Sequence, residues 1–128
     1  MRLTTRSAVW FTCFFLWFAI LWWLSSTVHD APEALDFRAS DKILHFGWFF
    51  GGAGLLSAAL YTRDRDGSEK KRIILTVALV TLVGVFDEFH QSKVPGRHGN
   101  DPYDLSADFI GALAGALAFR PFRRFFRD

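Results

Sequence analysis

The chain has 128 residues, of which 51% are hydrophobic and 22% charged, and its formal net charge is +2 at pH 7. The length leaves room for a single domain, and the hydrophobic residues are gathered into four runs that are almost free of charge. This pattern excludes an ordinary soluble domain, whose helices would each carry a clear polar face.

Each apolar run predicts one transmembrane helix. A helix that crosses a bilayer needs about 20 residues, and the first two runs come close to that length. The last two reach it only by including the polar residues beside them. We therefore expect an all-α, polytopic membrane protein with one domain, residues 1–128, and a bundle of four transmembrane helices at about 8–25, 42–61, 73–91 and 104–120.

The first helix follows Arg2 and Arg6, as the apolar core of a signal peptide would. Its apolar run is longer than such a core, and bulky Trp22 and Trp23 stand where small residues precede a cleavage site. We expect an uncleaved anchor, and its many Trp and Phe residues predict a lipid-facing helix. Cys13 lies within it and has no partner in the chain for a disulfide.

The second and fourth helices contain small residues four positions apart. Such pairs let helix backbones approach closely in lipid. We expect close packing at three of them: Gly47/Gly51, Gly54/Ala58 and Gly111/Gly115.

The basic residues predict the orientation of the bundle. Both chain ends and the loop between the second and third helices carry 11 Lys and Arg, whereas the opposite side carries 4. Cytoplasmic segments are enriched in Lys and Arg, so both termini are expected in the cytoplasm. This bias also explains the basic composition, and we expect no nucleic-acid partner.

Polar residues gather at the outer ends of the second, third and fourth helices. Ionisable groups within membrane spans face the bundle interior or a water-filled cavity, so we expect them to line one outward-facing site. The expected ligand-binding residues are Asp41, Lys42, His45, Gln91, Arg97, Asp104 and Asp108. The expected catalytic residues are Asp87, Glu88 and His90.

Helical spacing refines this prediction for the second helix. His45 follows Asp41 by four residues and Lys42 by three, so it can lie near either. Ser40 or Asp41 stands where the helix is expected to begin, and either side chain could cap it.

The same spacing applies to the third and fourth helices. Asp87 and Gln91 share one face of the third helix, and Asp104 and Asp108 share one face of the fourth. The face of the fourth helix that carries Asp104 and Asp108 also carries Gly111, which predicts that this face is turned toward the bundle.

The histidines and carboxylates also bear on metal binding. His with carboxylates is a ligand set that divalent metals accept. The sequence contains no HExxH or other closely spaced metal signature, no phosphate-binding loop and no Rossmann fingerprint. We therefore expect neither a metal nor a cofactor.

These polar motifs resemble those of the VanZ-like family of small membrane proteins. The resemblance lies in Asp41-Lys42-x-x-His45, Asp87-Glu88-x-His90-Gln91, Pro95-Gly96-Arg97, and Asp104 with Gly111 and Gly115. The chain has Val94 where the family usually has Phe, and Asp108 where Asn is common. The resemblance implies a multi-pass protein of the bacterial cytoplasmic (inner) membrane with its polar site facing the periplasm. The family name comes from an accessory protein of glycopeptide-resistance clusters associated with teicoplanin, which implies an effect on glycopeptide susceptibility.

Three functional hypotheses follow. The first is binding of a cell-envelope lipid or amphiphile, such as a lipid-linked precursor, with Arg97 and Lys42 meeting its anionic group. The second is an intramembrane hydrolase or transferase, with Glu88 or His90 as general base and Asp87 orienting it. The third is a purely structural buried ion network. Proton-coupled transport is weaker, because no charged residue marks the inner half of any span.

Overall fold

The computed structural model describes residues 4–27, 37–97 and 99–127, the first four residues of the second segment by their backbone alone. The regular secondary structure of this part of the chain is entirely helical, which confirms the all-α prediction. They are α1 (Thr5–Ser25), α2 (Phe37–Arg63), α3 (Glu69–Gln91), α4 (Pro102–Phe122) and a short 3-10 helix, η1 (Arg123–Phe126).

The four α-helices are long and apolar enough to cross a membrane. Their candidate spans contain 21, 23, 23 and 25 residues in chain order, the last of them covering both α4 and η1. A span of about 20 residues suffices to cross the hydrocarbon core. The prediction of four transmembrane helices is therefore confirmed by length and composition.

The helices begin earlier than their apolar runs, because capping residues determine where a helix starts. The Thr4 hydroxyl accepts a hydrogen bond from the Ser7 N–H at 3.2 Å and starts α1. The Ser68 hydroxyl caps α3 in the same way. Asp101 caps α4, whose first residue is Pro102, a residue favoured at that position.

The start of α2 differs from the prediction. This helix begins at Phe37, so Asp41 lies about one turn inside it and does not cap it. The predicted cap at Ser40 or Asp41 is therefore wrong, and the loop before α2 ends sooner than expected. Polar residues extend a helix beyond its apolar run whenever their backbone groups can continue the hydrogen-bond ladder.

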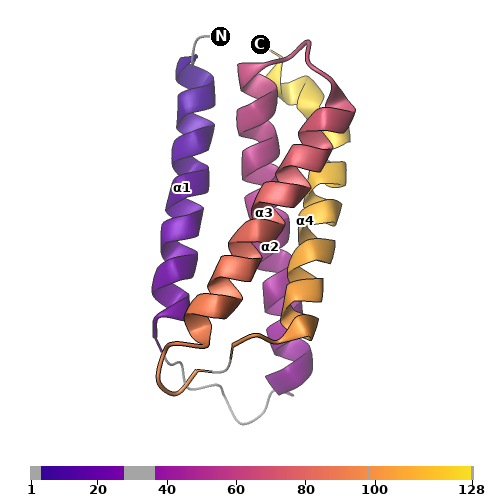
Figure 1. Cartoon of the computed structure of the whole chain (residues 1–128). Coiled ribbons are helices and arrows are strands. Elements are labelled where there is room, and N and C mark those ends of the chain that lie inside the picture. The colour runs from indigo at the N-terminus through magenta and orange to yellow at the C-terminus, as the bar shows by residue number, and fades with distance from the viewer. Residues whose placement is uncertain (1–3, 28–36, 98, 128) are drawn as a thin grey trace.

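Figure 1 shows how the helices are arranged. The helix α3 crosses obliquely in front of α2, with α1 on one side and α4 on the other. The beginning of α1, the α2–α3 loop and the end of α4 lie at one end of the bundle. The end of α1, the start of α2, the end of α3 and the start of α4 lie at the other end, which is called the polar end below.

The helices α2 and α4 form the most extensive packing contact. A Cβ atom on Gly111 would overlap the backbone carbonyl oxygen of Phe46, and one on Gly115 would overlap that of Phe50. The predicted close packing at Gly111/Gly115 is therefore confirmed.

The small residues of α2 behave differently from the prediction. No atom of a neighbouring element lies within 4 Å of the Cβ position at Gly47, Gly51 or Gly54. The predicted close packing at Gly47, Gly51 and Gly54 is therefore wrong, whereas Ala58 is buried. The helix α4 instead meets the backbone carbonyls of Phe46 and Phe50, the residues just before Gly47 and Gly51. Spacing alone does not determine which face of a helix with small residues is covered.

The helix α1 packs against α2 through one stripe of side chains, namely Phe14, Trp17 and Leu21. The Trp17 indole N–H donates to the Trp48 carbonyl oxygen at 3.0 Å. A Cβ on Gly52 would overlap the Trp17 ring, so glycine makes room for it. The helix α1 was expected to face lipid on all sides, but one stripe of it is buried against α2. Its remaining surface is exposed, for example at Phe15 and Trp23.

The α2–α4 contact generates the first prediction. Replacing Gly115 with Ala forces the backbones apart, and we expect the free energy of unfolding to fall by about 1–3 kcal/mol, as for other overpacked interiors. Gly51→Ala is the matched control, since its Cβ meets open space and alanine favours a helix by up to about 1 kcal/mol. Unfolding of the purified protein in detergent measures both, and equal destabilisation by the two variants would contradict the packing.

Candidate functional site

Four carboxylates are buried at the polar end. Asp87 and Glu88 come from the end of α3, and Asp104 and Asp108 come from the start of α4. Their exposed fractions are 2%, 3%, 5% and 0% in that order. A buried carboxylate is costly unless a cation or hydrogen-bond donor compensates it, so the partners of these four groups determine what the site can do.

Lys42 compensates one of these carboxylates, that of Asp104. Its ammonium group hydrogen-bonds the carboxylate of Asp104, lies 3.0 Å from Asp101 Oδ2 and 3.6 Å from Asp41 Oδ2. The predicted ligand-binding residues Lys42 and Asp104 therefore pair with each other. This ion network ties α2 to the start of α4.

Asp101 belongs to this network although the sequence analysis did not select it. Its other oxygen accepts from the Tyr103 N–H at 2.8 Å and caps α4. The Lys42 ammonium lowers the pKa of the Asp101 carboxyl. Because the folded-state pKa is the lower one, this stabilisation is present above the unfolded pKa of about 3.9 and is lost as pH falls through the folded pKa.

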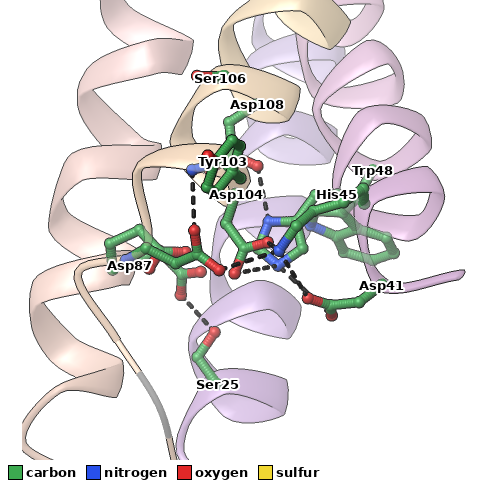
Figure 2. A network of polar contacts seen from close by, with 12 residues as sticks. Ser25, Asp41, His45, Trp48, Asp87, Tyr103, Asp104, Ser106 and Asp108 are labelled. Atoms are coloured by element: carbon green, nitrogen blue, oxygen red, sulfur yellow. Dashed lines mark hydrogen bonds and ion pairs between the residues drawn. The ribbon is translucent and has the colours of Figure 1, made fainter. Parts of the chain in front are cut away.

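His45 lies between α2 and α4. Its Nδ1 is 2.7 Å from Asp108 Oδ1, and its Nε2 is 3.8 Å from oxygens of both Asp41 and Asp104. Figure 2 shows Asp41 and His45 reaching toward Asp104 and Asp108. Helical spacing allowed His45 to lie near Asp41 or Lys42, and the structure places its ring beside Asp41.

Asp87 has a separate set of partners. The Gln91 amide donates to Asp87 Oδ2 at 2.8 Å, which confirms their shared face. The Ser25 hydroxyl, from the end of α1, donates to Asp87 Oδ1 (Figure 2). No feature of the sequence singled out Ser25, because a serine at a helix end is a common cap.

Only one of the two carboxylate oxygens of Glu88 has a hydrogen-bond partner among the described residues. Its Oε2 accepts a hydrogen bond from the Asp101 N–H at 3.0 Å. Among the described residues, the buried Oε1 of Glu88 and the buried Oδ2 of Asp108 have no hydrogen-bond partner.

His90 lies apart from these carboxylates. Its ring stacks on Trp22 with centroids 3.8 Å apart, and its Nε2 is 2.8 Å from the Ser26 hydroxyl. The hydrogen bonds of Asp87 go to Ser25 and Gln91 instead. The expected arrangement in which Asp87 orients a His90 base is therefore wrong, and Trp22 and Ser26 are contacts that the sequence analysis missed.

A cavity of about 340 Å³ opens between α1, α2 and α3 at the polar end. Its apolar wall consists of Leu21, Leu24, Leu44, Trp48 and Phe49. Its polar wall consists of Ser25, Asp41, His45, Asp87, Gln91 and Arg97. Five of the predicted site residues therefore line one cavity, while Lys42, Glu88, His90, Asp104 and Asp108 do not line it.

A tight turn positions Arg97 at this cavity. Its N–H donates to the Val94 carbonyl at 3.1 Å, which closes a turn through Pro95 and Gly96. Gly96 has φ 80°, a conformation that this kind of turn requires at its third position and that glycine adopts without strain.

The chain matches the family model described as VanZ/LLP1 over residues 3–126. It belongs to the VanZ/LLP1 family. The match covers nearly the whole chain and confirms the resemblance drawn from the polar motifs. Comparison with curated proteins and with solved structures gave no match.

One motif departure has a visible consequence in this VanZ/LLP1 protein. Asp108 stands where the resembled motif commonly has Asn. Its carboxylate forms a hydrogen bond with His45. Unlike an amide, a carboxylate offers acceptor oxygens only and adds negative charge. The departure therefore adds a fourth buried carboxylate to those of Asp87, Glu88 and Asp104.

The Lys42 network generates the second prediction. We expect Lys42→Met to destabilise the protein, because it leaves the buried Asp104 without its cation. Asp104→Asn introduced into Lys42→Met should recover part of the loss, with a coupling energy of about 0.5–3 kcal/mol. Unfolding in detergent measures the cycle, and Lys70→Met, at an exposed position, is the control. Strictly additive effects would argue against the ion network.

Proposed function

We propose that this VanZ/LLP1 membrane protein binds a cell-envelope amphiphile with an anionic headgroup in the cavity between α1, α2 and α3. The observation that carries the proposal is the cavity itself, which is apolar on one side and polar on the other. Its volume of about 340 Å³ falls within the range of about 300–1,000 Å³ that small-molecule sites occupy.

The apolar wall suits an acyl or isoprenoid chain. Leu21 and Leu24 come from α1, and Leu44 and Trp48 come from α2. These side chains offer a hydrocarbon surface to a chain that enters from the bilayer, where no water has to be displaced from it.

Arg97 suits the anionic group. Lys42, the other cation once expected to meet a ligand, is held by Asp101 and Asp104. The Arg97 side chain makes no hydrogen bond or ion pair with the described residues, so its guanidinium is available to a phosphate or carboxylate, which a guanidinium binds through two parallel hydrogen bonds.

The carboxylates of the cavity suit donor groups on the same ligand. Asp41 and Asp87 line the polar wall together with Arg97. Hydroxyl or amino groups of a headgroup donate to carboxylates, so a sugar or amino-bearing phosphate headgroup fits better than a bare phosphate. A lipid-linked envelope precursor has this chemistry. Its binding would alter susceptibility to glycopeptides such as teicoplanin, the effect associated with the family name.

The third prediction tests this cavity. Arg97→Gln should weaken binding of a fluorescent phosphatidylserine probe, whose headgroup carries both a phosphate and an amino group, by about 10- to 100-fold, the equivalent of a lost charged hydrogen bond of about 1.5–3 kcal/mol. Lys93→Gln is the matched control, because Lys93 is an exposed cation of the same loop that lies over the Phe89 ring outside the cavity. Equal binding by wild type and Arg97→Gln in detergent micelles would remove the proposal.

We further propose that the protein lies in the bacterial cytoplasmic membrane with its polar end facing the periplasm. The support is the positive-inside bias. The end of the bundle away from the site carries most basic residues, including Arg63, Arg65 and Arg72 of the α2–α3 region and Arg123 and Arg124 of η1.

Cysteine labelling provides the fourth prediction. In a Cys13→Ala background, Lys93→Cys should react with a membrane-impermeant maleimide on intact cells, because the loop after α3 faces outward. Lys70→Cys, near the opposite end, should react only after the membrane is permeabilised. The reverse pattern would invert the proposed orientation.

A further inference from the structure

Two buried oxygen atoms at the polar end have no hydrogen-bond partner among the described residues, namely Glu88 Oε1 and Asp108 Oδ2. Both residues are more than nine-tenths buried, with exposed fractions of 3% and 0%. A buried acceptor without a donor is costly, and an ionised one more so. Their positions therefore indicate a group that these oxygens bind.

The two carboxylates face the same space between α3 and α4. The helix α3 has Gly84 one turn before Glu88, and a Cβ on Gly84 would lie 2.8 Å from Asp108 Oδ2. The glycine thus gives the Asp108 carboxylate room beside α3, on the face that also carries Glu88.

The cations of the polar end are committed elsewhere. The Lys42 ammonium contacts Asp41, Asp101 and Asp104. Arg97 lines the separate cavity between α1, α2 and α3, of which Glu88 and Asp108 are not part. Neither Glu88 nor Asp108 has a Lys or Arg partner among the described ion pairs.

His45 completes a ligand set. One ligand atom each from His45, Glu88 and Asp108 lie within 4.8 Å of one another, a separation that side-chain rotation closes when an ion binds. His45 Nδ1 lies 2.7 Å from Asp108 Oδ1, whereas Nε2 lies beside Asp41 and Asp104. In its unprotonated form, Nδ1 is therefore the ring nitrogen that would bind the ion together with the carboxylates of Asp108 and Glu88.

We propose that His45, Glu88 and Asp108 bind a divalent transition-metal ion. The ion neutralises two buried carboxylates and supplies the partner that their free oxygens lack. A mixed nitrogen and oxygen ligand set suits Zn²⁺ or Mn²⁺ better than Mg²⁺ or Ca²⁺, which prefer oxygen alone. The proposal goes beyond amphiphile binding and does not depend on it.

A second group, formed by Asp41, His45 and Asp104, has similar spacing. There the Lys42 ammonium already contacts both carboxylates, so a cation occupies the position that a metal would take. The geometry therefore favours the group with Glu88 and Asp108.

This site departs from the expectation drawn from the sequence, which contained no metal signature. Such signatures are short because their ligands share one helix or loop. His45, Glu88 and Asp108 come from three different helices, and only the folded bundle brings them together.

The experiment is metal analysis of the full-length protein, purified in detergent, stripped with EDTA and dialysed against Zn²⁺ or Mn²⁺. We expect the wild type to retain one ion per chain and to unfold at a higher temperature with the metal than without it. Glu88→Gln and Asp108→Asn should lose both effects. Asp41→Asn is the matched control and should keep them, because Asp41 belongs only to the second group.

Three results would overturn the proposal. They are an absence of retained metal in the wild type, retention by folded Glu88→Gln, and loss on Asp41→Asn. If the Glu88 and Asp108 variants do not fold, pulsed electron paramagnetic resonance of Mn²⁺ bound to the wild type decides. Coupling to an imidazole nitrogen supports the site, and its absence contradicts it.

Discussion

The close approach of α4 to α2 determines the geometry of the polar end. Gly111 lies against the Phe46 carbonyl. Phe46 directly follows His45, and Gly111 lies about one turn after Asp108. With a side chain at this glycine, the two helices would separate, and the short contacts from His45 to Asp108 and from Lys42 to Asp104 would be lost. An apolar packing contact therefore holds together charged groups that would otherwise be too costly to bury.

The polar residues fall into parts with different roles. Lys42, Asp101 and Asp104 form a satisfied network between α2 and α4, as the structural hypothesis expected of the whole set. Asp87 is also satisfied, yet it shares a cavity wall with Arg97, whose guanidinium is available to a ligand. Glu88 and Asp108 differ from both groups, since each keeps a buried oxygen without a donor. A single buried ion network therefore does not describe this site.

The sequence predicted those features that depend on one helix at a time. The shared face of Asp87 and Gln91 and the packing role of Gly111 follow from helical spacing, and both were confirmed. Helix starts were less well predicted, because hydrophobicity marks membrane depth whereas Thr4, Ser68 and Asp101 mark where backbone hydrogen bonding begins.

Contacts that depend on how helices are placed against each other could not be predicted. The helix α1 contains apolar residues through most of its length, so its end gave no sign that Ser25 would meet Asp87 or that Ser26 and Trp22 would meet His90. The glycines of α2 show the same limit. Their spacing was right for packing, yet α4 meets the backbone at Phe46 and Phe50 instead.

The contact of the Trp17 ring with Gly52 has a consequence for the cavity between α1, α2 and α3. It fixes α1 to α2 near the middle of both helices, and beyond it α1 contributes Leu21, Leu24 and Ser25 to the cavity wall. Past this anchor, the hydrogen bond from Ser25 to Asp87 ties the end of α1 to α3, and the Lys42–Asp104 pair, which joins α2 to α4, does not involve α1. The shape of the cavity between α1, α2 and α3 therefore depends on where α1 lies, whereas the ion network between α2 and α4 does not.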